Sequence, residues 1–417
     1  MNVSGTKSGF ANSGHLPTLI AALLYFDVSF MVWVVLGPLA PFLRDELHLT
    51  ATQQGLVVAV PLLGGSFFRP ILGTLGDRIG QKRTGVIGLC LTIVPLAIGW
   101  SGPTSVAWLY AIGLMLGIAG ASFAVALPLA SRWYPPEYQG VVLGIAGAGN
   151  SGSLLATLFA PRLVERVGWA HTLGLAIVPV LAVTVLFVLL AKESPVRRRA
   201  ASWSEYAGVL KEPDTFWFAF LYSLTFGGFV GFTSFLPTFF REQYHVSRVS
   251  AGDFTTMVVI AGSFMRPVGG WISDRIGGYR LLMGLLLAID ACLLTVASLP
   301  PLPIVLPLLF VSLALLGMGN GAIFQLVPQR FADRIGIVTG IVGAAGGLGG
   351  FFLPTILGFS RDVTGSYRLG LLMLALVFFA GTLALLELGV RWSRHWGGTT
   401  VKQLGIFCYR LPERRRL

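Results

Sequence analysis

The sequence has little charge for its length. Of its 417 residues, only 12% are charged and 54% are hydrophobic, whereas a soluble domain carries about a quarter charged residues. Acidic residues are scarce, 18 against 30 Lys and Arg, which gives a formal net charge of +12. Because the basic residues gather in short loops between apolar runs, they indicate membrane orientation rather than a nucleic-acid surface. The composition excludes a soluble domain and predicts an integral membrane protein.

Groups for metal binding, redox chemistry or catalysis are also lacking. Cys90, Cys292 and Cys408 are far apart and form no metal or redox motif. The sequence has no His/Cys cluster, no paired carboxylates and no phosphate-binding loop, so it indicates neither an enzyme nor a bound metal or cofactor. No cleavable signal peptide is expected, since Met1–Gly14 is polar and leads directly into an apolar run.

What the chain does have is a series of apolar runs of about 20 residues, the length that crosses a bilayer. Twelve are found, at 17–41, 52–75, 84–101, 105–130, 139–161, 170–191, 215–239, 250–273, 281–299, 302–326, 336–358 and 367–390. Lys and Arg are frequent after the even-numbered runs, which places both termini in the cytoplasm by the positive-inside rule. We therefore expect an all-α integral membrane fold of twelve transmembrane helices. Its parts are a cytoplasmic N-terminal segment (1–16), two six-helix halves (17–191 and 215–390), a cytoplasmic linker (192–214) and a basic cytoplasmic tail (391–417).

A duplicated stretch organises these runs. Gly64–Arg83 (GGSFFRPILGTLGDRIGQKR) returns as Ala261–Arg280 (AGSFMRPVGGWISDRIGGYR), so that Arg69 corresponds to Arg266 at a shift of 197 residues. Nearly the same shift relates the first run to the seventh and the fifth to the eleventh. A parallel repeat of this kind predicts two pseudo-symmetric halves that face each other about an axis along the membrane normal and enclose a central site.

Both copies place an arginine inside an otherwise apolar helix. A charged side chain at the bilayer centre costs about 2.5–3.5 kcal/mol even on insertion scales, and two arginines at one depth also repel each other. An anion between Arg69 and Arg266 would offset both effects, because the planar guanidinium offers paired donors that suit planar oxyanions. The alternative is that each arginine reaches an interface or a helix carbonyl instead.

Several short motifs accompany the arginines. They are Gly73–Arg83 and its weaker copy Gly270–Arg280, the glycine-rich segments Gly147–Gly152 and Gly343–Gly350, and the segments Tyr222–Gly231 and Gly120–Phe123. The first two are similar to the loop signature of the Major Facilitator Superfamily. With the arginine pair and the glycine-rich segments, the chain up to about residue 390 resembles the nitrate/nitrite porters of that superfamily.

The resemblance implies which residues contact the transported anion. In that family two arginines clamp nitrate from opposite halves, and they match Arg69 and Arg266 here. Further residues match positions that line or polarise the pocket, namely Tyr222, Phe226, Phe123 and Asn150. The Asn150 amide could instead satisfy a carbonyl of a neighbouring helix. The family often has Ala-Asn-Phe where this sequence has Ala121-Ser122-Phe123, which changes one hydrogen-bonding detail.

Other residues are candidates for gating and coupling. Glycines of the fifth and eleventh runs are expected to let these helices slide or bend, with close packing as the alternative; they are Gly147, Gly149, Gly152, Gly343, Gly346 and Gly347. By the resemblance, Asp77 pairs across the two halves when the cytoplasmic side is shut, and the signature residues Arg78 and Asp274 belong to the same gate. Asp27, inside the first run, is a candidate proton carrier. Its alternative role is as a partner for an arginine or a helix end.

The expected function is nitrate and nitrite transport by alternating access, with nitrate/proton symport as the coupling mode. Nitrate/nitrite exchange is the alternative, because two fixed positive charges can require an anion to reset the carrier. The same fold could carry a small carboxylate, which the glycine-rich segments disfavour, and the duplicated half-bundle disfavours an anion channel. One chain holds a complete site, so we expect a monomer in the cell membrane that contacts lipids.

Overall fold

The protein is described by a computed structural model over residues 13–135, 138–194, 202–331 and 334–395. These residues form helices joined by short connections, and no strand occurs among them. The predicted all-α class is confirmed. Parts of the expected N-terminal segment (1–12), linker (195–201) and tail (396–417) lie outside the described residues.

Helices of the first half are broken inside several of the expected spans. They are α1 Leu16–Trp33, α2 Leu36–Leu47, α3 Ala51–Ile79, α4 Gln81–Trp100, α5 Val106–Gly120, α6 Phe123–Ser131, α7 Gln139–Gly147, the 3-10 helix η3 Ala148–Ser151, α8 Gly152–Leu175 and α9 Ile177–Leu190. The first span consists of α1 and α2, the fourth of α5 and α6, and the fifth of α7, η3 and most of α8. Inside α8, Gly168 has a φ of 81°, a left-handed value that glycine adopts without strain, and separates the fifth span from the sixth.

Helices of the second half are longer and unbroken. A short helix, α10 (Trp203–Leu210), lies in the expected linker. The spans follow as α11 Pro213–Tyr244, α12 Arg248–Ile276, α13 Gly278–Ala297, α14 Leu302–Arg330, α15 Ile335–Thr364 and α16 Arg368–His395. The helices extend past the predicted runs: the eleventh run was expected at 336–358, and α15 continues to Thr364.

The expected twelve crossings are confirmed. Ten stretches of the described residues are long and apolar enough to cross a membrane. One of them, Gly140–Leu190, has 51 residues and makes two crossings because the chain turns at Gly168. The remaining crossing is α12, which has 29 residues like α3 but is less apolar, since it contains charged residues such as Asp253 and Arg266.

The duplication repeats the signals that begin and end helices. His48 ends α2 with a φ of 51°, and His245 ends α11 with a φ of 54°. Two residues after each histidine, a hydroxyl residue caps the next helix. The Thr50 side chain accepts a hydrogen bond from the Gln53 backbone amide at the start of α3. The Ser247 side chain accepts one from the Ser250 backbone amide at the start of α12. A side-chain acceptor at this position satisfies a helix N–H that otherwise lacks a partner. The two arginine-bearing helices therefore start in the same way.

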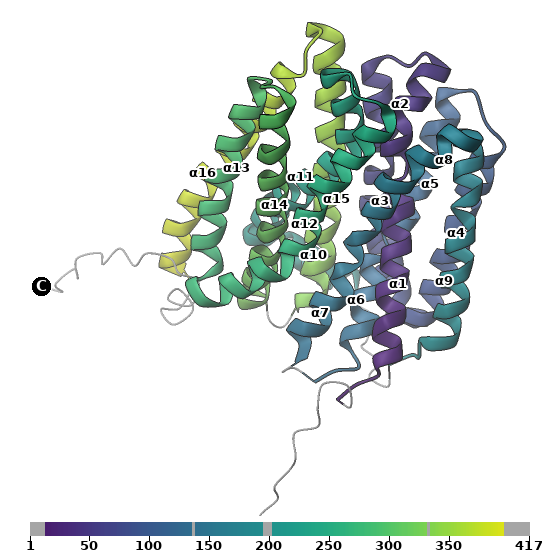
Figure 1. Ribbon diagram of the computed structural model, residues 1–417. Helices are drawn as coiled ribbons and strands as arrows, with labels where there is room; N and C mark the ends of the chain where they lie inside the picture. The colour runs from purple at the N-terminus through teal and green to yellow at the C-terminus, as the bar shows by residue number, and fades with distance from the viewer. Residues whose placement is uncertain (1–12, 136–137, 195–201, 332–333, 396–417) are drawn as a thin grey trace, which may run out of the picture.

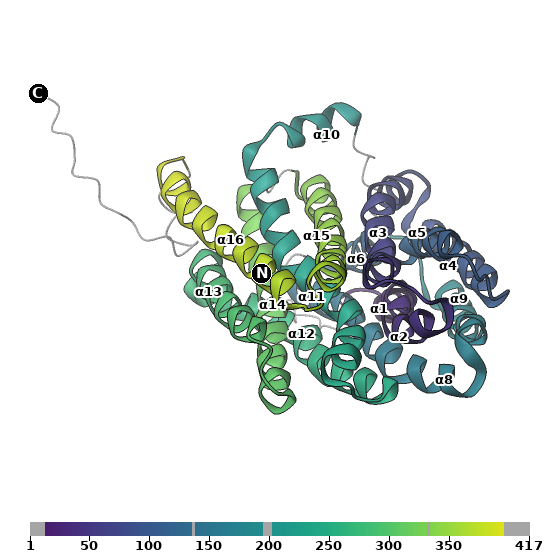
Figure 2. The ribbon, with the colours of Figure 1, turned by 90° about the horizontal axis from the view of Figure 1, so that it is seen from above.

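The two halves lie side by side as adjacent bundles, with α1–α9 in one and α11–α16 in the other (Figure 1). From above, α15 lies next to α3 where the bundles meet (Figure 2). The helix pairs α2–α11 and α8–α12 also pack across this boundary. Both arginine-bearing helices, α3 and α12, therefore lie at the boundary between the halves.

The halves meet closely at one end of the molecule. We call this the outer end; it contains the connections at 48–50, 101–105, 245–247, 298–301 and 365–367. Ion pairs join the halves here, namely Arg44–Glu242, Asp45–Arg248 and Arg162–Asp253. In addition, the Asp362 carboxylate accepts from the backbone N–H groups of Ala51 at 2.9 Å and Thr52 at 2.7 Å.

The halves are apart at the other end, where the described termini lie. This inner end contains the connections at 80 and 277 and the described residues 132–135, 138, 191–194, 202, 331 and 334. Its ion pairs lie within one half: Arg132 with Asp77 in the first, and Arg330 with Glu212 and Asp214 in the second. A Cβ added to Gly140, Gly144 or Gly147 of α7, or to Gly336 or Gly340 of α15, would meet no described atom within 4 Å. The glycine faces of the fifth and eleventh spans are therefore open at this end.

Candidate anion-binding site

Arg69 is held at the boundary by two backbone carbonyls. Its side chain is 2% exposed. Nε donates to the Gly120 carbonyl at 3.1 Å, and Nη1 donates to the carbonyl of Gly343 in the other half. The Gly120 carbonyl is available because the helix breaks between α5 and α6, where the Ala124 amide bonds to Ala121 instead. The break in the fourth span thus serves to position Arg69.

Arg266 approaches the same place from the second half. Its side chain is only partly buried. The guanidinium carbons of Arg69 and Arg266 each lie 5.5 Å from the centre of the Phe123 ring. They are therefore no further apart than twice that distance, and they repel each other electrostatically. The structure thus brings both duplicated arginines to the Phe123 ring.

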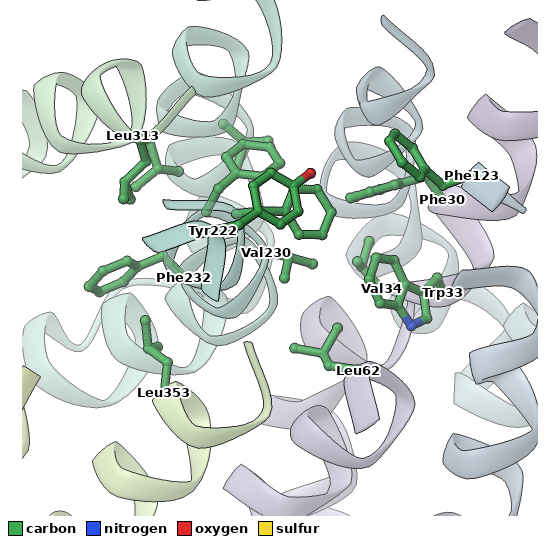
Figure 3. Packing of buried hydrophobic residues seen from close by; sticks show 14 of the residues in the cluster. Phe30, Trp33, Val34, Leu62, Phe123, Tyr222, Val230, Phe232, Leu313 and Leu353 are labelled. Carbon is green, nitrogen blue, oxygen red and sulfur yellow. The ribbon is translucent and has the colours of Figure 1, made fainter. Parts of the chain in front are cut away.

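Aromatic rings surround the two guanidinium groups. Tyr222 and Phe226 stack at 5.2 Å with an interplanar angle of 5°, and Phe226 lies 5.2 Å from the Arg69 guanidinium. Tyr222 interacts electrostatically with both arginines. Figure 3 shows Tyr222 on one side of the boundary, with Phe123 on the other. The predicted lining residues Phe123, Tyr222 and Phe226 are therefore brought together.

Two further rings at the site were not predicted. Trp33 lies 5.2 Å from the Arg69 guanidinium, and Phe324 lies 5.1 Å from that of Arg266. The sequence offers no signal for either, because both are single aromatic residues in apolar helices, which usually indicate core packing. Trp33 is fixed by its indole N–H, which donates to the Pro61 carbonyl at 2.7 Å.

The two arginines retain unused hydrogen-bonding capacity. Within the described part of the chain, Nη2 of Arg69 and Nη1 of Arg266 are buried and have no hydrogen-bond partner. A buried donor without a partner costs about 1–3 kcal/mol, and more when it is charged. No carboxylate among the described residues pairs with either guanidinium. The cationic pair therefore has the donors and the charge to bind one small anion.

Asn150 and Asp27 lie on neighbouring segments of the first half. Asn150 belongs to η3 and is 1% exposed, and its Oδ1 atom has no partner among the described residues. Asp27, near the middle of α1, accepts a hydrogen bond from the Ser151 hydroxyl at 2.6 Å, while the Gly152 amide donates to the carbonyls of Asn150 and Gly149. Asp27 therefore contacts the residue that precedes α8, and both of its predicted roles, proton carrier and partner for a helix end, stay predictions.

The predicted gating glycines are of two kinds. Gly149 and Gly152 pack against the backbone of α1 at Asp27, while Gly346 packs on Tyr222 and Gly347 on Ser66. The other two are less tightly packed: a Cβ added to Gly147 would meet no described atom within 4 Å, and the Gly343 carbonyl accepts a hydrogen bond from Arg69 of the other half. Close packing thus explains four of these glycines in this conformation.

We predict that Gly152→Ala destabilises the protein, because the added methyl group would collide with the Asp27 carbonyl. Overpacking of this kind costs about 1–3 kcal/mol. The expected result is a lower midpoint of thermal unfolding in detergent. Gly144→Ala is the matched control on the same span, since its methyl group enters open space. Equal midpoints for the two variants would contradict the close contact between η3 and α1.

The signature residues lie at the inner end, away from the guanidinium groups. Asp77 accepts from Arg132 at 2.6 Å and from the Gln81 side chain at 3.2 Å, all within the first half. Arg78 and Asp274 are exposed. Pairing of Asp77 across the halves was expected only with this end shut, and here the end is open.

Comparison with known proteins agrees with this architecture. The family model described as Major Facilitator Superfamily matches residues 21–354. The chain belongs to this superfamily. It is 35% identical to the probable nitrate/nitrite transporter NarK2 of Mycobacterium tuberculosis, over 87% of this chain and 93% of the relative. It is 33% identical to the nitrite extrusion protein of Bacillus subtilis, over 84% and 89% of the two chains. The probable nitrate transporter NarT of Staphylococcus carnosus is also 33% identical, over 89% and 94%.

Solved structures share the fold of this superfamily member. The xylose transporter XylE of E. coli, in a partially occluded inward open conformation, matches with a TM-score of 0.73 at 15% identity, over 90% of this chain and 98% of that one. A superfamily chain with these relatives is a multi-pass transporter of the cell membrane rather than an enzyme. The predicted family is confirmed.

Proposed function

We propose that the protein moves nitrate and nitrite across the cell membrane by alternating access, with the anion clamped between Arg69 and Arg266. The observation that carries this proposal is the pair of unpartnered, buried guanidinium N–H groups, one from each half, beside the shared ring of Phe123. The names of the relatives support the choice of anion.

The shape and chemistry of the site support a small planar anion. Nitrate is flat, so its edge can accept from guanidinium donors while its face lies on an aromatic ring. Nitrite has the same charge and a similar edge, so the same clamp admits it. A carboxylate with an alkyl group would have to place that group among the rings of Phe123, Phe226 and Trp33, which already surround Arg69.

The difference between the two ends supports alternating access. If the positive-inside rule holds, the inner end faces the cytoplasm, and the molecule is in an inward-facing state with its outer end closed. Substrate would then enter from outside when the outer ion pairs separate and the glycine faces of α7 and α15 close at the inner end. One chain contains both halves of the clamp, which is consistent with a functional monomer.

For coupling, we propose nitrate/proton symport with Asp27 as the candidate proton carrier. Asp27 is a carboxylate inside a membrane helix and is not fully buried, so a proton can reach it. Nitrate/nitrite exchange is the second candidate. It is favoured by the lack of any carboxylate partner for the two arginines among the described residues, since an empty carrier would have to reorient with two uncompensated charges.

Reconstitution in liposomes tests both the substrate and the coupling. We expect purified protein to take up nitrate, with nitrite competing and acetate not competing. Symport predicts uptake into nitrite-free vesicles that an inward proton gradient accelerates severalfold. Exchange predicts uptake only when nitrite or nitrate is inside, with no response to the gradient.

Empty liposomes and protein that has been heat-denatured before reconstitution are the controls. Failure of the intact protein to move nitrate or nitrite under either condition would contradict the proposed function. Acetate uptake at the rate of nitrate would instead favour the carboxylate alternative.

A further inference from the structure

The fifth span has a feature that its repeat in the second half lacks. It is interrupted by η3, whereas α15 runs without a break from Ile335 to Thr364. The interruption lies directly against Asp27 of α1, whose carboxylate accepts a hydrogen bond from the Ser151 hydroxyl at 2.6 Å, while Gly152 packs on the Asp27 backbone. In the second half the corresponding positions are Leu224 and Gly347, which can form no such contact. The carboxylate, its hydroxyl partner and the break occur together, and only in the first half.

The two sides of this break differ in packing. On the α8 side, Gly152 contacts the Asp27 backbone, and Thr157 bonds to Thr256 of the other half at 2.7 Å. On the α7 side, Gly140, Gly144 and Gly147 face open space. α7 packs on α1 and α6 of its own half, whereas α8 also contacts α12 of the other half. A span whose two parts have different neighbours can bend at the break between them. The Asp27 contacts are formed at that point.

The break is also close to the anion site. Gly149, within η3, packs on Phe26, and Phe26 lies 5.6 Å from the Phe123 ring that both arginines share. Asn150 follows Gly149 and is buried with an unused Oδ1 acceptor. The backbone conformation of η3 therefore decides where the Asn150 amide lies relative to the clamp.

We propose that Asp27 is a positioning residue: by accepting a hydrogen bond from the Ser151 hydroxyl, its carboxylate fixes the break of the fifth span and with it the Asn150 amide at the anion site. This positioning role requires an acceptor oxygen on residue 27 but no proton transfer. A variant that keeps an acceptor oxygen and cannot carry a proton therefore distinguishes it from the proton-carrier role. The transport readout below rests on the proposed function, whereas the hydrogen-exchange readout does not.

The variants Asp27→Leu and Asp27→Asn distinguish the two roles. Leucine is the residue at the corresponding position of the second half and removes both acceptor oxygens, whereas asparagine keeps one and cannot carry a proton. For Asp27→Leu we expect hydrogen exchange of residues 139–152 to become about tenfold faster. We also expect the nitrate dissociation constant to rise by about tenfold, because a charge-assisted hydrogen bond is lost. For Asp27→Asn we expect both values to stay within about threefold of the wild type, while any response of uptake to a proton gradient is lost.

Two further variants guard against general misfolding. Ser151→Ala removes the donor of this hydrogen bond and should change the exchange rate and the nitrate dissociation constant in the same direction as Asp27→Leu. Asp290→Asn is the matched control, because Asp290 is also a buried carboxylate in a membrane helix but lies on α13 in the second half. Asp290→Asn should leave the hydrogen-exchange rate of residues 139–152 unchanged. All variants are compared after size-exclusion chromatography in the same detergent.

Three results would overturn the proposal. The first is that Asp27→Leu shows the wild-type rate of hydrogen exchange in residues 139–152 and the wild-type nitrate affinity. The second is that Asp27→Asn changes both quantities as much as Asp27→Leu does, and the third is that Asp290→Asn accelerates this hydrogen exchange equally. The second would assign the effect to the charge instead of the acceptor. If the wild type neither binds nor moves nitrate, the proposed function fails, and the exchange measurement still decides the role of Asp27.

Discussion

Replacing Arg69 with lysine is expected to abolish nitrate uptake, with a fall of at least about 100-fold. Arg69 uses Nε and Nη1 to hold the carbonyls of Gly120 and Gly343, which leaves Nη2 for the anion. Lysine has a single ammonium group and cannot hold carbonyls in both halves and bind a planar anion at once. Each hydrogen bond to a charged group contributes about 1.5–3 kcal/mol, so the loss of two such bonds accounts for a fall in uptake of about 100-fold.

Uptake into liposomes, normalised to the amount of inserted protein, measures this effect. Arg266→Lys should also impair uptake, but less, because no described backbone carbonyl accepts a hydrogen bond from Arg266, in contrast to the two that hold Arg69. Arg275→Lys is the matched control, since Arg275 lies on the same helix as Arg266 but is exposed and stacks on Trp271 at 3.6 Å. Normal nitrate uptake by both Arg69→Lys and Arg266→Lys would show that the clamp is wrong.

The arginine pair was predictable because the sequence repeats it. A charge inside an apolar run is costly, and its recurrence at a shift of 197 residues indicates that both copies have a shared role. The number of spans followed from run length in the same direct way. Resemblance to a family then added Tyr222, Phe226 and Phe123, which the structure brings to the same place.

The positions of the helix breaks and the partners across helices were not predictable. Breaks at Ala121–Ser122 and at η3 lie within apolar, glycine-containing runs that read as continuous helix. Asp27 and Ser151 are 124 residues apart in sequence, so their contact depends on how the first and fifth spans cross. Trp33 and Phe324 likewise contact the arginines only through tertiary packing. Pattern reasoning detects periodicity along one helix and carries no information about which faces of distant helices meet.

Reversing the charge of Glu242 is expected to open the outer end. Glu242 accepts from Arg44 of the other half and from the Tyr367 hydroxyl at 2.6 Å, and its side chain is only 13% exposed. Glu242→Arg breaks this partly exposed ion pair and replaces its attraction by repulsion between two positive charges, since Arg44 lies opposite. The conformation with a closed outer end should lose population, and nitrate uptake should fall by at least about tenfold.

Labelling of a cysteine at the outer boundary measures the opening directly. Thr238 is fully buried and bonds to Gln54 of the other half at 3.1 Å, so Thr238→Cys in a background without native cysteines should react with an impermeant maleimide only when this end opens. We expect the cysteine at position 238 to be labelled faster in the Glu242→Arg protein. Adding Arg44→Glu to that protein should slow the labelling part of the way back to its original rate. Glu46→Arg, at an exposed position nearby, is the control for a change of charge alone.

The decisive measurement is whether Arg44→Glu slows the labelling of the Glu242→Arg protein again. Slower labelling would show that the loss of the ion pair, and not general damage to the fold, opened the outer end. A swapped pair restores the attraction between residues 44 and 242, while Arg361, which lies 4.0 Å from Glu242, would still repel the new arginine. Reversal should therefore be incomplete. Slow labelling of Thr238→Cys in the Glu242→Arg protein would mean that the outer end is closed by the packing of α2 on α11 rather than by its charges.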